Sequence, residues 1–247
     1  MNSTVPRLIA VTAVMFTAST PMTLKFPLYA DPLPTATSLS LPHTIDAGSD
    51  EHDAMKVAAS ADETHPLGLG AKIPDHMQLI DIDGKPFNLN AAVAAKPTIL
   101  IFYRGSWCPF CNLQMAQLEE IEPKLEAQGY QILAISPDLP SNLQVSVGKH
   151  HLTYTLLSDS NMGTSEAFGL AYHVDDDTYA HMSSFGVNLE AATGTKQREL
   201  PVPAAYVLDR FGTIRFAYSN PNFRVRVDPQ KLLTAATAAL SVAKSPN

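Results

Sequence analysis

The only two cysteines of the 247-residue sequence stand three positions apart in the segment FYRGSWCPFC, residues 102–111. Strand-forming residues at 98–103 precede Cys108, and apolar side chains at helical spacing follow Cys111. The pattern predicts a strand-to-helix turn, where unpaired amides and the positive end of the helix dipole stabilise a thiolate. Because a thiolate is a nucleophile and a second thiol is close enough to close a disulfide, the pair indicates redox chemistry.

A zinc site and a structural disulfide are the alternatives to redox chemistry for the cysteine pair. A zinc site needs further Cys or His ligands at suitable spacing, and the adjacent pair His150 and His151 lies well downstream in a polar stretch. A purely structural disulfide would close so short a loop that it constrains the unfolded chain very little. A redox role is therefore favoured.

The amino-terminal quarter of the chain differs in composition from the rest. Residues 1–30 contain Arg7 and then an apolar run, 8–18, too short to span a bilayer, which is typical of a secretory signal peptide. Residues 31–65 are rich in Pro, Ser, Thr, Ala and Asp and are expected to form a disordered acidic linker. The folded domain is expected at residues 66–247. A working signal would make the protein periplasmic or secreted, and otherwise it would be cytoplasmic.

The net charge of −7 belongs mostly to that linker, which carries seven acidic side chains against one lysine. The folded part has no basic stripe of the kind that nucleic-acid binders use, so no nucleic-acid partner is expected.

Strands and helices alternate along the expected domain. A hairpin with a tight turn at Asp83-Gly84 comes first. An insertion at 173–199 has few periodic apolar residues and is expected either to cover the active site or to support an oligomer contact. Within it, the acidic run at 175–177 is interpreted as a solvated loop. The other strands are expected at 98–103, 131–136, 154–157, 204–208 and 213–218. Helices are expected at 89–95, 143–150, 165–170 and 229–243. A further helix should run from the cysteines to Gly129, with a bend or restart at Pro123. This order predicts an α/β, thioredoxin-like fold with a central mixed sheet flanked by helices.

Six segments stand in a recognisable order along the chain: FYRGSWCPFCNL at 102–113, AISP at 134–137, LSD at 157–159, LPVPA at 200–204, VLDRFG at 207–212 and NPNF at 220–223. Through these segments the chain from about residue 66 to 243 resembles the alkyl hydroperoxide reductase / thiol-specific antioxidant family, and within it the peroxiredoxin-like group with a C-x-x-C. The resemblance implies a thiol-dependent peroxidase that reduces hydrogen peroxide or organic hydroperoxides, with no cofactor or metal, a thioredoxin-like protein as reductant and a possible homodimer.

The chain departs from the peroxiredoxin pattern at three supporting positions. On that pattern Cys111 takes the place of the peroxidatic cysteine, Cys108 that of a threonine and Arg104 that of a proline, while Pro203 stands near the family's arginine. The substitutions resemble thioredoxin instead. Trp107 followed by the C-x-x-C is similar to the thioredoxin active-site turn, and Pro203 occupies the place of a cis-proline whose neighbouring backbone docks extended substrates.

The two resemblances disagree about the nucleophile, which is Cys108 on thioredoxin logic and Cys111 on peroxiredoxin logic. Each of the supporting residues has two interpretations. Arg104 either favours the thiolate or is a surface cation, and Trp107 either shields the pair by packing or frames a substrate groove. Pro203 either follows a cis peptide bond, or is trans and has only a structural role. Arg224 and Arg226, further along, are interpreted as a solvated strand edge.

The sequence is therefore compatible with three functions. The first is a thiol peroxidase that uses Cys108 and Cys111. The second is a thiol-disulfide oxidoreductase that acts on protein disulfides, and the third is a redox-responsive binding module in which the disulfide switches the insertion between two states.

Overall fold

The computed structural model describes residues 57–150 and 153–243, so the expected signal peptide and most of the expected linker lie outside the described residues. Folded structure begins before Pro66, because the Ala58 N–H donates to the Ala171 oxygen and the Ala58 oxygen accepts from the His173 N–H. A short 3-10 helix, Ala61–Glu63, follows. No helix in the described ranges is long and apolar enough to cross a membrane.

The strands form a seven-stranded mixed sheet in the order β2-β1-β5-β4-β3-β8-β9 and a separate pair, β6 with β7. Strands β3, β4 and β5 run parallel to one another, and the other pairings are antiparallel. The strand bounds are β1 Gln78–Asp81, β2 Pro86–Asn88, β3 Thr98–Phe102, β4 Gln131–Ser136, β5 Thr155–Ser158, β6 Ala171–His173, β7 Glu199–Pro201, β8 Ala204–Leu208 and β9 Ile214–Ser219.

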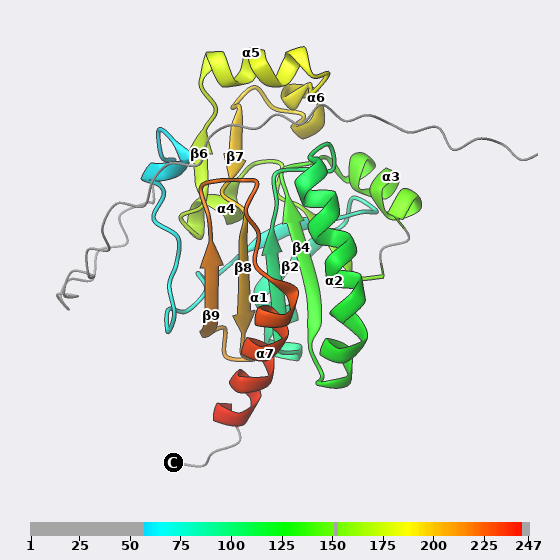
Figure 1. Cartoon of the computed structure of the whole chain (residues 1–247), viewed down its shortest axis with the longest axis vertical. Coiled ribbons are helices and arrows are strands. Elements are labelled where there is room, and N and C mark those ends of the chain that lie inside the picture. The colour runs from blue at the N-terminus through cyan, green and yellow to red at the C-terminus, as the bar shows by residue number, and fades with distance from the viewer. Residues whose placement is uncertain (1–56, 151–152, 244–247) are drawn as a thin grey trace, which may run out of the picture. The chain divides into compact units, whose positions relative to one another are not determined.

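Helices cover both faces of this sheet (Figure 1). They are α1 Leu89–Ala95, α2 Pro109–Ala127, α3 Pro140–His150, α4 Gly163–Ala167, α5 Asp176–Ser184, α6 Leu189–Thr193 and α7 Pro229–Ala243. The arrangement confirms the expected α/β class with a mixed sheet flanked by helices.

Strand β3 shows how the sheet separates two cores. Its five residues are all buried, and alternate side chains point to opposite faces. Ile99 and Ile101 join the core beneath α2, α3 and α7, whereas Leu100 and Phe102 join the core beneath α1 and Phe168. The continuous apolar run of this strand in the sequence is therefore the consequence of burial on both sides.

The structure refines several expectations about helices. Helix α2 continues through Pro123 without the restart that was one of two alternatives there, and it ends where expected, with Gly129 at a φ of +89°. Helix α3 begins three residues earlier than expected, at Pro140, because proline fits the first helical turn. The acidic run of the insertion begins helix α5 and is not a loop, and Asp175 and Asn188 each accept a hydrogen bond from a backbone N–H in the first turn of α5 and α6.

Candidate active site

The two cysteines lie at the beginning of α2. Cys108 is the N-cap residue, and its carbonyl oxygen accepts hydrogen bonds from the N–H groups of Cys111 at 3.0 Å and Asn112 at 3.1 Å. The Asn112 amide also donates to the Ser106 oxygen at 3.0 Å, which fastens the turn to the helix. The expected strand-to-helix turn is confirmed, and it places both sulfurs at the positive end of a 19-residue helix.

The pKa values of the two thiols are shifted in opposite directions. A hydrogen bond from the Cys111 thiol is the main reason that the pKa of Cys108 falls to about 6, with help from the charges of Arg104 and Arg226. Burial is the main reason that the pKa of Cys111 rises well above its ordinary value. These pKa values favour a thiolate at Cys108 and a protonated thiol at Cys111 at neutral pH. Both cysteines are reduced and buried, at 1% and 0% exposure.

Two guanidinium groups approach this pair. The Arg226 Nη2 donates to the Cys111 sulfur over 3.4 Å, from the segment between β9 and α7. Arg104 is 5% exposed and lies over the Phe223 ring at 4.1 Å and the Trp107 ring at 5.1 Å. The Nε atoms of both arginines are buried without a hydrogen-bond partner among the described residues. The site thus holds two positive charges beside one thiolate.

This arrangement corrects the interpretation of Arg226 as part of a solvated edge, whereas Arg224 is exposed as expected. It also shows that Arg104 is not a surface cation. No pattern near residue 226 indicated a contact with a cysteine 115 positions earlier, because the contact depends on how the chain returns to α2 after β9.

The insertion packs against the cysteine turn. The Met182 sulfur of α5 lies 3.8 Å from the Arg104 Nη2, and Trp107 packs against the buried cluster of Val174, Met182, Leu189 and Leu200. Figure 1 shows α5 and α6 beyond the end of the sheet at which α2 begins. Of the two roles considered for this segment, the contacts support a cover over the cysteines. The acidic residues 175–177 are solvent-exposed, as expected, but they start a helix.

Asp138 is a residue of the site that the sequence did not point to. It follows β4, is fully buried, and its Oδ2 accepts a hydrogen bond of 2.6 Å from the Ser106 N–H. Burial raises its pKa to about 6. Its Oδ1 and the Trp107 Nε1 are both buried without a hydrogen-bond partner within the described part of the chain. The carboxyl group therefore sits under the turn that carries Cys108.

Gly105 lies between these two unpaired atoms. Its φ is +146°, and a Cβ at this position would come within 2.4 Å of the Trp107 Nε1 and 3.0 Å of the Asp138 Oδ1. The turn requires glycine for this reason, because only a residue without a Cβ allows such a close approach.

Pro203 has the second of the two conformations left open by the sequence. The described residues contain no cis peptide bond, so the Val202–Pro203 bond is trans. The neighbouring backbone is also occupied, because the Val202 N–H donates to the Leu170 oxygen and the Pro203 oxygen accepts from the Asn220 N–H. A substrate-docking role for this segment loses its support.

A mixed sheet flanked by helices, with a reduced cysteine pair at the beginning of the helix after the central strand, defines a thioredoxin-like dithiol protein. Residues 69–217 match the AhpC/TSA family model, which spans more than half of the sequence, so the chain belongs to this family. The match ends before Phe223 and Arg226, which the structure brings to the site.

Curated relatives and solved structures agree with this assignment. The chain is 28% identical over 148 residues to chloroplastic peroxiredoxin Q of Gentiana triflora, covering 60% of this chain and 58% of that protein. It is 32% identical over 106 residues to peroxiredoxin Bcp of Escherichia coli, covering 43% and 67%. The match thus spans less than two thirds of the Gentiana protein.

Structures of a Xylella fastidiosa PrxQ mutant and of peroxidoxin BcpB from Mycobacterium tuberculosis share the fold. The first has a TM-score of 0.56 at 15% identity, covering 70% of this chain and 98% of that one. The second has a TM-score of 0.54 at 17% identity, covering 70% and 97%.

Proposed function

We propose that the protein is a thiol-dependent peroxidase that reduces hydrogen peroxide or organic hydroperoxides through Cys108 and Cys111. The observation that carries the proposal is a pair of thiols between two guanidinium groups, in which the pKa of Cys108 is lowered and the pKa of Cys111 is raised. Membership of the AhpC/TSA family and similarity to proteins named peroxiredoxin Q and Bcp support the same reaction.

In the first step the Cys108 thiolate attacks one peroxide oxygen. The S–O bond forms as the O–O bond breaks, and the sulfur is oxidised to a sulfenic acid. The departing oxygen takes a proton from solvent and leaves as water or an alcohol. A guanidinium stabilises the charge that develops on the departing oxygen. The charges of Arg104 and Arg226 both contribute to the lowered pKa of Cys108, with Arg104 the larger of the two, so Arg104 is the cation that we assign to this role.

In the second step the Cys111 sulfur attacks the sulfur of the sulfenic acid. A disulfide forms and water leaves, carrying the sulfenic oxygen and the Cys111 proton. The raised pKa of Cys111 keeps this proton in place until the first step is complete. A thioredoxin-like protein then returns two electrons by thiol–disulfide exchange and is itself oxidised to a disulfide.

This order assigns the attack to Cys108, as in thioredoxin, rather than to Cys111. The N-cap position of Cys108 and its pKa near 6 support the assignment. The same two features favour a second function, a thiol-disulfide oxidoreductase acting on protein disulfides, because a low-pKa first cysteine is what disulfide exchange requires.

Stopped-flow fluorescence of Trp107, the only tryptophan in the sequence, tests both functions. Reduced protein is mixed with hydrogen peroxide or with an oxidised protein disulfide, alongside the Cys108→Ser and Cys111→Ser variants. We expect a fast, concentration-dependent change with peroxide that Cys108→Ser abolishes and Cys111→Ser retains. A peroxide reaction no faster than that of a free small thiol, together with fast reaction with the protein disulfide, would refute the peroxidase in favour of the second function.

We further propose that residues 1–30 act as a secretory signal and that the enzyme works outside the cytoplasm. The intact mass of the protein recovered from the exported fraction tests this. Retention of residues 1–18 would contradict it.

A further inference from the structure

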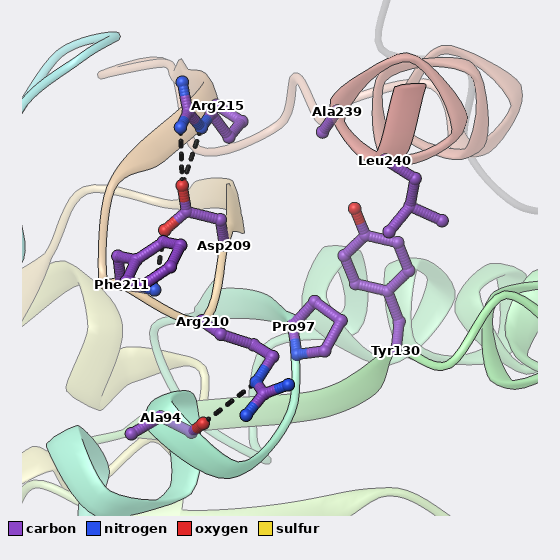
Figure 2. A pocket seen from close by; sticks show the side chains of 9 residues that line it. All are labelled: Ala94, Pro97, Tyr130, Asp209, Arg210, Phe211, Arg215, Ala239 and Leu240. Carbon is purple, nitrogen blue, oxygen red and sulfur yellow. Dashed lines mark hydrogen bonds and ion pairs between the residues drawn. The ribbon is translucent and has the colours of Figure 1, made fainter. Parts of the chain in front are cut away.

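A cavity lies at the end of the sheet opposite the cysteines. It has a volume of about 440 Å³ and is drawn in Figure 2. Pro97, which lines it, directly precedes β3, whereas the cysteine turn follows the other end of that strand. The residues that line this cleft are Ala94, Pro97, Tyr130, Asp209, Arg210, Phe211, Arg215, Ala239 and Leu240.

The walls of the cleft are mainly apolar. In Figure 2 the Tyr130 ring and Leu240 form one side, Pro97 lies next to them, and Phe211 stands on the opposite side. Phe211 is 78% exposed, which is unusual for so large an apolar side chain. The Tyr130 hydroxyl donates to the Ala236 oxygen over 3.0 Å, and burial raises the pKa of Tyr130 to about 12, so this residue offers the cleft a neutral ring.

The polar groups of the cleft leave one cation available. Asp209 is fully engaged: its Oδ2 accepts from the Arg215 Nε at 2.8 Å, and its Oδ1 accepts from the N–H groups of Phe211 and Thr213. Arg210 donates only its Nε, to the Ala94 oxygen at 3.2 Å, and its two Nη atoms have no partner among the described residues. Figure 2 shows this guanidinium pointing along the floor of the cleft, below Pro97. With two guanidiniums and one carboxylate, the cleft is positive.

From these features we infer that the cleft binds a small amphipathic anion, with an apolar body between Tyr130, Leu240 and Phe211 and a carboxylate on the Arg210 guanidinium. The volume lies in the range of about 300–1,000 Å³ typical of small-molecule sites. A guanidinium with two free Nη groups matches the geometry of a carboxylate. The site is separate from the cysteines and does not depend on the peroxidase reaction.

Isothermal titration of the full chain with octanoate, octan-1-ol and octylammonium tests the inference. Arg210→Gln removes the charge, and Ala239→Phe fills the cleft. Lys124→Gln and Ala116→Phe, on the exposed surface of α2, are the matched controls. Phe211→Ser, on an exposed turn, removes one wall without touching the core, and circular dichroism verifies that every variant is folded.

We expect a single octanoate site. Arg210→Gln weakens octanoate binding by about two- to fivefold, the range expected for an exposed ion pair, and leaves octan-1-ol unaffected. Ala239→Phe and Phe211→Ser weaken both ligands, octylammonium binds less tightly than octanoate, and the controls change nothing.

Octanoate binding that survives Ala239→Phe, or no binding up to about 10 mM, would overturn the inference. A dimer in analytical ultracentrifugation that Phe211→Ser converts to a monomer would also overturn it, because the cleft would then be a contact between two copies of the chain.

Discussion

Replacing Cys111 tests the electrostatic account of the site directly. The Cys111 thiol donates the hydrogen bond that contributes most to the lowered pKa of Cys108. Alanine removes this donor, whereas serine retains one of similar size. We therefore expect the pKa of Cys108 to remain near 6 in Cys111→Ser and to rise in Cys111→Ala.

The size of the rise follows from the strength of the lost bond. A hydrogen bond to a charged group contributes about 1.5–3 kcal/mol, and one pH unit corresponds to about 1.4 kcal/mol, so the midpoint should move up by about one to two pH units. At pH 7 the ionised fraction of Cys108 then falls from about nine-tenths to between about one-half and one-tenth.

The assay is the rate of alkylation of Cys108 by iodoacetamide between pH 4 and pH 10, followed by mass spectrometry. The Cys108→Ser variant is the control, because Cys111 should then be alkylated only at high pH. Equal midpoints for the alanine and serine variants would refute the role of the hydrogen bond. A low midpoint in Cys108→Ser would assign the thiolate to Cys111 instead.

Three further predictions concern the surroundings of the pair. Burial raises the pKa of Asp138 to about 6, so its ionisation disfavours the folded state as the pH rises from about 4 to 7. Burial also raises the pKa of Asp159 to about 6, so this second carboxyl titrates over the same range. Urea unfolding of Asp138→Asn should therefore lose up to about 3 kcal/mol less stability over this range than the unsubstituted protein, and an unchanged pH dependence in the variant would contradict this. Gly105→Ala should destabilise the fold by about 1–3 kcal/mol and alter Trp107 fluorescence, because the new Cβ overlaps the indole; unchanged emission and melting temperature would count against this. Met182→Ala should speed alkylation of Cys108 at pH 8 because it loosens the cover, whereas the volume-conserving Met182→Leu should not; equal rates in both variants would show that α5 does not limit access.

The sequence predicted those elements whose local patterns agree with their packing. The apolar run of β3, the periodic start of α2 and the apolar face of α7 each indicate their structure without reference to distant residues. The position of Cys108 at the beginning of α2 followed from this alone.

Features that depend on distant parts of the chain were not predictable from the sequence. Helix α5 is polar on most of its surface and buries only Met182, so its weak apolar pattern did not indicate a helix after the acidic run at 175–177. Arg226 contacts Cys111 because the segment after β9 passes the beginning of α2, and Asp138 is buried beneath Ser106 because β4 lies beside β3 in the sheet. No local sequence pattern encodes either arrangement. The trans Val202–Pro203 bond shows that a position shared with thioredoxin does not carry its conformation with it.

Strand β3 keeps the cysteine turn and the cleft apart by about 17 Å, given a rise of about 3.3 Å for each of its five residues. Substitutions separated by more than about 7–10 Å and without shared partners usually have additive effects on the free energy of unfolding, within about 0.3–0.5 kcal/mol. A double variant such as Gly105→Ala with Arg210→Gln should therefore show the sum of the two single effects. The two ends of the domain can then change independently during evolution or engineering, because neither restricts which residues the other tolerates.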